Sequence, residues 1–202
     1  MYLLLALLCG YLIGNFSPSY LSVKMIKHDD IRDYGSGNAG ATNAIRVLGF
    51  KTGLVVFILD MLKGILAVWL GKTIAADYGI VLGALGVVLG HNFPVFLGFR
   101  GGKGVAATSG IILAISPQSF LVLAVVFLLI IATTRIVSLA SIVIGILIPF
   151  TLYYFQEPSE IVLLGIILCI LIIVRHHTNI RRLLDGNESK LNLRLNTRPE
   201  RN

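Results

Sequence analysis

The segment GVAATSGIILAISPQSFLVLAVVFLLIIATTR, residues 104–135, is a long apolar run that ends at one arginine. Built as a single helix, residues 104–134 would measure about 46 Å, far more than the ~30 Å of hydrocarbon in a bilayer. A Ser-Pro-Gln sequence at 116–118 interrupts the run near its middle, where proline breaks a helix. The segment therefore predicts two short membrane-spanning helices, 104–116 and 118–134.

Apolar runs of this kind recur along the whole chain. Of its 202 residues, 56% are hydrophobic and only 13% are charged, which excludes a soluble domain around one core. No basic region and no small-x-small cleavage site accompany the first run, which argues against a signal peptide at 1–22. We predict an all-α integral membrane protein with a single membrane-embedded domain over 1–202. Its seven predicted spans are 2–23, 53–71, 78–98, 104–116, 118–134, 136–155 and 159–175.

The lysine and arginine residues predict the orientation of these spans. With the N-terminus outside and the C-terminus in the cytoplasm, all of them except Lys63 and Lys72 fall in cytoplasmic loops or in the C-terminal tail. Positive residues are enriched on that side of membrane proteins. Joining 104–134 into one span would separate Arg135 from the basic tail, so the rule favours seven spans. Because loop positions explain the net charge of +7, we expect no nucleic-acid partner.

The sequence GSGNAGATNAIR, residues 35–46, is the first of three polar segments on the predicted cytoplasmic face. Glycines allow positive φ and a close approach of backbone N–H groups, which bind phosphate when they converge. A short helix beginning near Asn38 would add its N-terminus, and Arg46 would add charge. A flexible loop is the alternative, and neither nucleotide-binding fingerprint is present. The candidate residues are Ser36, Gly37, Asn38, Gly40, Thr42, Asn43 and Arg46.

The second polar segment is GHNFPVFLGFRGGKG, residues 90–104. Its glycines expose backbone directly before a predicted helix, and the lysine among them can bind an anion as a point charge. A pair of basic anchors at the membrane interface is the alternative. A lysine at a helix N-terminus is unfavourable unless an anion lies beside it, so the pattern favours an anion site. The candidate residues are Gly101, Gly102, Lys103 and Gly104.

The third polar segment is RHHTNIRRLLDGNE, residues 175–188, which we predict to be a helical exit from the last span that ends near Gly186. His176 and Asn179 lie three residues apart and therefore share one helix face. A histidine there could donate to phosphate, bind a hydroxyl or act as a base. Interfacial histidines in a tail attracted to anionic lipid are the alternative. No cluster of cysteines or carboxylates indicates a metal site.

Polar residues within the predicted spans complete the candidates. Asp60 and Lys63 lie three residues apart in the second span, so they can pair and lower each other's cost of burial. We interpret them as a structural pair. Ser138 and Ser141 could face the same cavity, although buried serines usually bond to backbone. The histidine and asparagine at 91–92 could simply support the neighbouring loop.

The three segments, in this order and spacing, resemble the acyl-phosphate-dependent glycerol-3-phosphate acyltransferases of bacteria. The similarity extends over nearly the whole chain and includes GSGNAGATN with Arg46, GHNFPVFLGFRGGKGVAAT and RHHTNIRRLLDGNE. One difference is Asn187, where the family commonly has threonine. The resemblance implies a multi-pass enzyme of the bacterial cell inner membrane, with its active site at the cytoplasmic face and a role in phospholipid synthesis.

The resemblance also implies the substrates and the residues that act on them. The enzyme would transfer a fatty acyl group from acyl-phosphate to the sn-1 hydroxyl of glycerol 3-phosphate, giving lysophosphatidic acid and phosphate. The family's essential serine and arginine correspond to Ser36 and Arg46, and its phosphate-holding loop corresponds to 101–104. We expect a monomer in the lipid bilayer that uses neither a cofactor nor a metal. The third-motif residues of the family correspond to His176, Asn179 and Glu188.

Direct attack by the glycerol hydroxyl is the mechanism we favour, because acyl-phosphate is already an activated anhydride. The proton would pass to a histidine or to a phosphate oxygen of the donor. A covalent route would need a base beside the serine, and His28 is the nearest candidate in sequence. His28 and Asp33 also match the H-x4-D pattern of thioester-dependent acyltransferases, but the surrounding loop is unlike that family. We assign catalytic roles to Ser36, Arg46, Lys103, His176 and Asn179, substrate binding to Ser141 and the loop residues named above, and a structural role to Glu188.

A small transporter or channel for an anionic metabolite is the alternative function. Transporters commonly contain inverted repeats and broken helices at the bilayer midplane. The glycine-rich segments of this chain instead cluster at one predicted face, and no internal repeat is visible. A membrane adaptor without chemistry would not need Lys103 beside three glycines. We therefore predict an enzyme.

Overall fold

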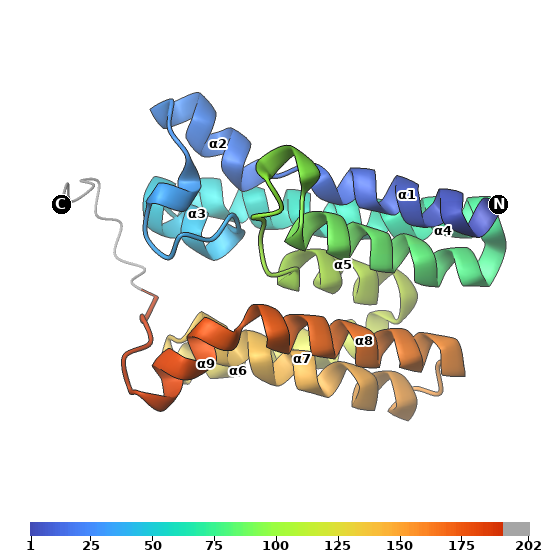
Figure 1. Ribbon diagram of the computed structural model, residues 1–202. Coiled ribbons are helices and arrows are strands. Elements are labelled where there is room, and N and C mark those ends of the chain that lie inside the picture. The colour runs from blue at the N-terminus through green and yellow to red at the C-terminus, as the bar shows by residue number, and fades with distance from the viewer. Residues whose placement is uncertain (192–202) are drawn as a thin grey trace.

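The computed structural model describes residues 1–191, and every regular element in that range is a helix, as predicted. Figure 1 shows the long helices side by side along one axis, with α1 and α4 on one side, α6, α7 and α8 on the other, and α5 between them. Arg194, Arg198 and Arg201 of the predicted tail lie outside the described residues. The elements are α1 (Tyr2–Asn15), α2 (Pro18–Lys27), η1 (Ile31–Asp33), α3 (Ala41–Leu48), α4 (Phe50–Asn92), η2 (Val95–Leu97), α5 (Val105–Ile115), α6 (Pro117–Thr134), α7 (Val137–Tyr154), α8 (Ser159–Arg175) and α9 (His177–Leu184).

Helix α4 is a hairpin of two helical halves, 50–74 and 77–92. The helix is interrupted at Ala75 and Ala76, and Ala76 has a φ of 50° and a ψ of −138°. The two halves pack at backbone contact, since a Cβ on Gly71 would lie 2.1 Å from the carbonyl oxygen of Gly79. Small residues allow this close approach between membrane helices. The hairpin places helices at both segments predicted as the second and third spans.

The predicted break in the run 104–134 is confirmed. Helix α5 ends at Ile115 and α6 begins at Pro117, so Ser116 alone separates them. Proline is well placed at the first position of a helix because its missing N–H would have no intrahelical partner there. The Ser116 hydroxyl donates to that of Ser119 over 2.9 Å, and both serines are fully buried.

The predicted first span, 2–23, lies within one apolar segment, Tyr2–Lys27, and two helices form that segment. Helix α1 ends at Asn15, and α2 begins at Pro18 after Phe16 adopts an extended conformation. The residue before a proline is disfavoured in the helical region, which accounts for the break at Ser17. The Asn15 side chain fixes the broken end, because its Oδ1 accepts from the backbone N–H of Val95 over 2.7 Å.

Helix α8, Ser159–Arg175, has the bounds predicted for the last span. Helix α8 does not continue straight into its exit segment, since α9 is bent from it by 61° after His176. Within the described residues, four helical segments are long and apolar enough to cross a membrane, or five if the bent pair counts as one. One of the four, Phe50–Leu97, contains the α4 hairpin, and α5 is a shorter apolar helix. The chain therefore has the make-up of an integral membrane protein.

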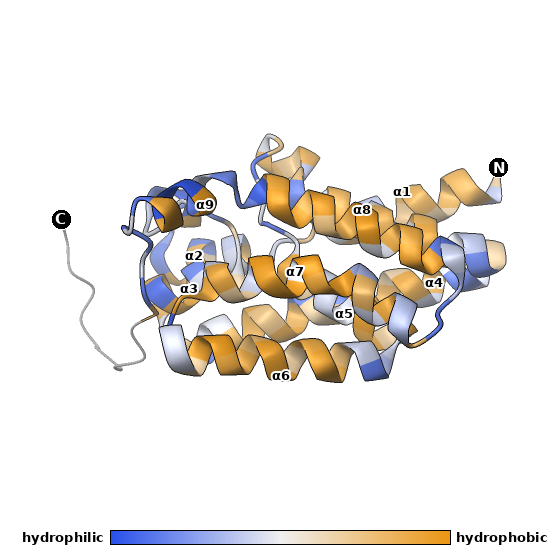
Figure 2. Ribbon diagram, turned by 90° about the horizontal axis from the view of Figure 1, so that it is seen from below, coloured by the Kyte–Doolittle hydropathy of each residue, from blue (hydrophilic) through white to orange (hydrophobic). Residues whose placement is uncertain are grey.

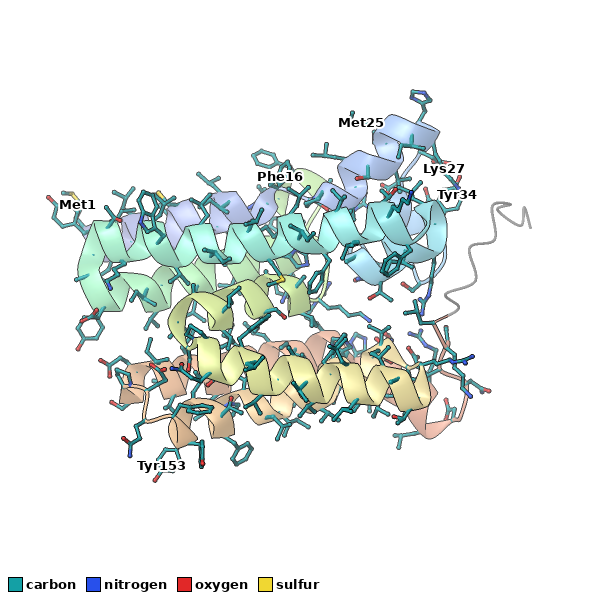
Figure 3. The ribbon with its side chains drawn as sticks, turned by 180° about the vertical axis from the view of Figure 1, so that it is seen from behind. Met1, Phe16, Met25, Lys27, Tyr34 and Tyr153 are labelled. Carbon is teal, nitrogen blue, oxygen red and sulfur yellow. The ribbon has the colours of Figure 1, made fainter. Side chains whose placement is uncertain are left out.

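The two ends of the bundle differ in polarity. Most residues of the long helices are hydrophobic, whereas hydrophilic residues gather at the end formed by α2, α3 and α9 (Figure 2). Met1 and Tyr153 lie at the opposite end of the bundle from Lys27 and Tyr34 (Figure 3). The three polar segments of the sequence thus share one end of the molecule.

Candidate active site

One cavity of about 110 Å³ lies at the polar end of the bundle and collects the three polar segments. An adjoining polar recess shares Ser36, Asn38 and Lys103 with it, and that recess is also lined by Gly37 and Gly101. Among the described residues, Gly102 lines neither space and lies against the ring of His91. The predicted site residues that line the cavity itself are Ser36, Asn38, Gly40, Thr42, Asn43, Arg46, Lys103, Gly104, Ser141, His176, Asn179 and Glu188.

The first glycine-rich loop is held in shape by the side chain of Asn43. The backbone N–H of Ser36 donates to Asn43 Oδ1 over 3.0 Å. Asn43 Nδ2 donates in turn to the carbonyl oxygens of Ile31 and Tyr34, over 3.2 and 2.9 Å. Its amide therefore already binds the loop on both sides. The sequence predicted Asn43 as a phosphate ligand, and these bonds add a supporting function for it.

Helix α3 begins directly after this loop and faces the cavity with its first turn. Its N-cap is Gly40, and no side chain caps its first N–H groups. Open N–H groups at a helix N-terminus attract anions. Thr42 in the first turn and Arg46 further along the helix both line the cavity. The short helix predicted after Asn38 is confirmed, and it presents donors and a positive charge to one space.

The second glycine-rich loop is held by other parts of the chain. The N–H groups of Gly101 and Gly102 donate to the carbonyl oxygens of Asn92 and His91, over 3.2 and 3.0 Å. On the other side, Arg175 donates to the Gly102 carbonyl oxygen through Nε and Nη2, over 3.1 and 2.9 Å. The loop ends at Gly104, whose φ of 81° suits glycine, and α5 follows at once. This clamp holds Lys103 at the cavity.

Lys103 reaches across the cavity to the third segment, where its ammonium donates to Asn179 Oδ1. Burial lowers the pKa of Lys103 to about 8, with Glu188 acting in the opposite direction and the nearby arginines lowering it further. An arriving phosphate would favour the charged lysine. The charged groups that act on Lys103 are thus three arginines, Arg46, Arg175 and Arg182, and one carboxylate, Glu188.

His176 is buried at the bend between α8 and α9 and lines the cavity. Its Nδ1 lies 2.8 Å from the carbonyl oxygen of Ile172. This geometry assigns the proton of the neutral ring to Nδ1 and leaves Nε2 as an acceptor. A base or a hydroxyl ligand needs such an acceptor.

Glu188 ties the turn after α9 to the rest of the site. It accepts hydrogen bonds from Asn179 Nδ2 over 2.7 Å, from Ser138 Oγ over 2.9 Å and from Arg182 Nε over 2.7 Å. Burial raises the pKa of the Glu188 carboxyl, but these hydrogen bonds lower it more, so that it stays ionised. The structural role implied for Glu188 agrees with these contacts. The Ser141 hydroxyl lines the cavity while donating to the Val137 carbonyl oxygen within α7.

The chain is similar in sequence to proteins of one known family. The family model described as glycerol-3-phosphate acyltransferase matches residues 4–186. The chain belongs to this family. A glycerol-3-phosphate acyltransferase of Thermoanaerobacter sp. is 44% identical over 191 residues, which cover 95% of this chain and 96% of the relative. Glycerol-3-phosphate acyltransferase 2 of Bacillus anthracis is 43% identical over 93% of this chain and 98% of its own length.

Solved structures of the family have the same fold. The crystal structure of PlsY, an integral membrane glycerol 3-phosphate acyltransferase, in its glycerol 3-phosphate form superposes with a TM-score of 0.89. It is 39% identical to this chain, and the match covers 94% of this chain and 96% of that one. The lysophosphatidic acid form gives a TM-score of 0.87 at 37% identity, over 95% of this chain and 96% of that one. Family and fold therefore agree.

Several residues at the cavity of this acyltransferase-family chain were not identified as site residues from the sequence. Phe57 on α4, Phe127 on α6 and Val137 on α7 form part of its apolar wall. Apolar side chains that face lipid and those that face a cavity look alike in an apolar sequence, so no signal distinguished them. Asp60 and His91 also reach the lining, although the sequence indicated only structural roles for them.

The H-x4-D pattern of His28 and Asp33 has no place at the cavity. His28 ends α2 in the left-handed conformation and is exposed, and Asp33 lines only the outer recess. Neither residue of the thioester-type pattern therefore lines the cavity.

In residues 1–191, no group of three or more His, Cys, Asp or Glu residues is arranged to hold a metal ion.

Proposed function

We propose that this protein transfers a fatty acyl group from acyl-phosphate to the sn-1 hydroxyl of glycerol 3-phosphate, giving lysophosphatidic acid and phosphate. This reaction is the first committed step of phospholipid synthesis. The single observation that carries the proposal is the cavity lined both by the loop 35–40 and by Lys103 at the end of the second loop. Because both substrates carry a phosphate, the site needs two anion-binding elements that act together.

Five residues carry the chemistry in this proposal. Arg46 and Lys103 bind phosphate oxygens as cations, and Ser36 donates from its hydroxyl or its loop. Asn179 holds Lys103 toward the cavity, and His176 offers Nε2 to the attacking hydroxyl. Binding is completed by Gly37, Asn38, Gly40, Thr42, Asn43, Gly101, Gly104 and Ser141, with Glu188 as the support. Gly102 was predicted to bind substrate, but it lies outside the cavity lining and supports the loop that carries Lys103.

The acyl chain has a path of matching polarity. Phe57 of α4 and Phe127 of α6 lie on the apolar wall of the cavity. These two helices belong to opposite sides of the bundle (Figure 1). We place the carboxyl end of the donor beside the phosphate ligands and its hydrocarbon along this wall toward the bilayer. Burial of apolar chain there contributes roughly 0.8 kcal/mol per methylene group.

The transfer is direct in this proposal. The glycerol hydroxyl oxygen forms a bond to the acyl carbonyl carbon, and the bond from that carbon to the phosphate oxygen breaks. The phosphate leaves with the bonding electron pair, and the hydroxyl proton passes to His176 Nε2 or to a phosphate oxygen. The cations at the cavity stabilise the negative charge that grows on the leaving phosphate.

The proposal includes a topology of seven spans, with the N-terminus outside, the C-terminus in the cytoplasm and the active site at the cytoplasmic face of the bacterial inner membrane. It is supported by the distribution of lysine and arginine and by the polarity of one end of the bundle (Figure 2). The protein acts as a monomer in this proposal. Cysteine labelling in intact cells tests the orientation in a chain whose Cys9 and Cys169 are replaced by alanine. An impermeant maleimide should label a cysteine at the exposed position 156 but not one at the exposed position 187. The reverse pattern would overturn the topology.

An assay with purified protein in detergent or in lipid cubic phase tests the function. Phosphate should be released from acyl-phosphate only when glycerol 3-phosphate is present, and lysophosphatidic acid should accumulate in equal amount. Replacing acyl-phosphate by an acyl thioester tests the donor, and only the phosphate should support turnover. Uptake of labelled glycerol 3-phosphate into sealed vesicles without product would instead support the transporter.

A further inference from the structure

A buried charged cluster lies beside the cavity, formed by Asp60, Lys63 and His91 from the two halves of α4. Lys63 Nζ lies 2.8 Å from Asp60 Oδ1 and 2.7 Å from His91 Nδ1. The exposed fractions of the three residues are 1%, 4% and 6%. The predicted pairing of Asp60 with Lys63 is confirmed, and His91 joins the pair from the other half of the hairpin.

The cluster also binds the broken end of α1. Lys63 Nζ donates to the carbonyl oxygens of Gly14 and Phe16, over 3.2 and 2.9 Å. These carbonyls lie where α1 ends, so the ammonium occupies the position of missing helical donors. A buried ion pair is a costly way to stabilise a fold, and apolar replacements are often neutral or better. Binding the end of α1 accounts for the ammonium of Lys63, but it does not account for the contact that His91 makes with the second loop.

The third member of the cluster touches the second glycine-rich loop. A Cβ built on Gly102 would lie 2.0 Å from His91 Nε2, 2.8 Å from its Cε1 and 2.9 Å from its Cδ2. The ring thus packs directly on the loop backbone, and only glycine fits there. The Gly102 N–H also donates to the His91 carbonyl oxygen over 3.0 Å. Gly102 is therefore held by both the backbone and the ring of His91, one residue before Lys103.

The bond to Lys63 fixes how the ring faces the loop. An ammonium can only donate, so His91 Nδ1 accepts and the ring proton is assigned to Nε2, on the side of Gly102. Asp60 neutralises the ammonium that makes this bond. With Arg175 holding the opposite side through the Gly102 carbonyl, the loop lies between two fixed supports.

We propose that Asp60, Lys63 and His91 are positioning residues that set the place of the loop 101–104, and with it Lys103, through the contact of the His91 ring with Gly102. The proposal rests on the phosphate-binding function proposed above for this loop. Displacing a binding group by 1 Å can cost roughly 10²-fold in rate. The cluster acts through substrate affinity and not through contact with the reacting atoms.

Paired substitutions at the contact test this proposal. His91→Ala should raise the KM of at least one phosphate-bearing substrate by about tenfold or more, because the loop loses its support. Gly102→Ala should do the same from the other side, since its methyl group displaces the ring. The double variant should bind better than Gly102→Ala alone, because all three atoms nearest to the new methyl group belong to the removed ring. A double variant no better than Gly102→Ala, or a His91→Ala protein with both KM values unchanged, would overturn the proposal.

A second pair of substitutions tests the charges if His91→Ala does not fold. Asp60→Leu combined with Lys63→Met replaces the ion pair by apolar side chains of similar size, which keeps the fold. The double variant should melt below the wild-type temperature, because the Gly14 and Phe16 carbonyls lose their donor, but it should still fold and show the raised KM. A wild-type KM in that folded protein would show that the charges do not position the loop.

Ser119→Ala is the matched control. It removes another buried hydrogen bond, to Ser116 at the far end of α5, and should lower the melting temperature without changing either KM. Stabilisation of each protein by glycerol 3-phosphate gives a readout besides turnover, since a ligand stabilises the state that binds it. Inactivity of the wild-type protein would count against the proposed function, whereas only the ratios of variants to wild type count for or against the cluster.

Discussion

The two glycine-rich loops meet at the same cavity but are held in different ways. Residues 35–40 are organised from within their own segment, by the Asn43 amide that binds Ser36, Ile31 and Tyr34. Residues 101–104 are held both by the backbone of His91 and Asn92 at the end of α4 and by Arg175 of the distant helix α8. The first loop depends on a single nearby side chain, and the second depends also on a side chain from another helix.

Different kinds of substitution should therefore disturb the two loops. A local substitution should release the first loop and leave the bundle intact. The second loop should respond to changes many residues away, because its supports come from residues 91–92 and from Arg175. Both loops need a fixed backbone to bind phosphate. Glycines alone cannot provide it, because glycine loses more conformational freedom on ordering than any other residue.

The largest effect is expected at Lys103, which links the second loop to the third segment. Lys103→Ala should reduce kcat/KM by about 10³-fold, because a phosphate ligand and a charge at the reacting group are both lost. Lys103→Arg should restore only part of this, since the planar guanidinium does not fit as a point charge between glycines. Steady-state kinetics with each substrate varied would decide, and near-normal turnover of Lys103→Ala at low substrate would contradict the assigned role.

Ser36 tests the first loop and the direct mechanism together. Ser36→Ala should lower the rate by roughly 10²–10³-fold, the cost of one donor in a partly water-excluded site. An obligate nucleophile would be lost far more completely. Double-reciprocal plots should intersect, because both substrates bind before either product leaves.

Incubation with acyl-phosphate alone is the sharper test of the same residue. Mass spectrometry should find no acyl adduct on Ser36. An adduct that glycerol 3-phosphate discharges would replace direct transfer by an acyl-enzyme route.

Much of this molecule was predictable from local chemistry. The break at 116–118 followed from proline, and both loops followed from glycines beside polar donors at one predicted face. The break at Ser17 was missed, although Pro18 carried the same signal as Pro117. The bend at His176 had no such marker in the sequence.

The support of the second loop by His91 and Asn92 was expected from the sequence, but the support by Arg175 could not be predicted. Arg175 bonds to backbone carbonyls 73 and 74 residues away in the sequence, and backbone acceptors leave no pattern in a sequence. Arg175 therefore resembled any basic residue at the membrane interface. Phe57 and Phe127 could not be recognised as cavity residues, because they do not differ in sequence from apolar neighbours that face lipid.

A paired comparison of the two supports gives a smaller effect than the two catalytic substitutions. Asn43→Ala leaves the Ser36 N–H and two carbonyls without their partner, and a lost buried bond costs about 1–3 kcal/mol. Arg175→Met removes the hydrogen bonds to Gly101 and Gly102 in the same way. Each should weaken binding by roughly tenfold to 10²-fold, but at a different phosphate. Measuring both KM values in both variants checks this, and identical patterns would mean that the loops do not divide the substrates.

The smallest expected effect is a pH dependence that belongs to the second loop alone. Lys103 has a pKa lowered to about 8 by burial, so the free enzyme carries this charge below pH 8 and loses it as the pH rises. Because phosphate binding requires the ammonium, kcat/KM should fall above about pH 8, by a factor approaching ten for each further pH unit. The first loop relies on neutral donors and on Arg46, whose guanidinium stays charged throughout this range.

Lys103→Arg separates the two loops in this experiment, since arginine cannot lose its proton there. Its lower activity should stay flat from pH 7.5 to 9.5, whereas the wild-type profile bends. A bend that persists unchanged in Lys103→Arg would assign the titrating group elsewhere, and the substrate phosphates are excluded because they lose their second proton near pH 6. A wild-type profile without a pH dependence would mean that Lys103 keeps its proton through the whole range. In that case the negative groups at the cavity raise the pKa of Lys103 more than its burial lowers it. A bend that disappears in Lys103→Arg would locate the pH-sensitive charge at the second loop, which a comparison of the two loops at a single pH cannot do.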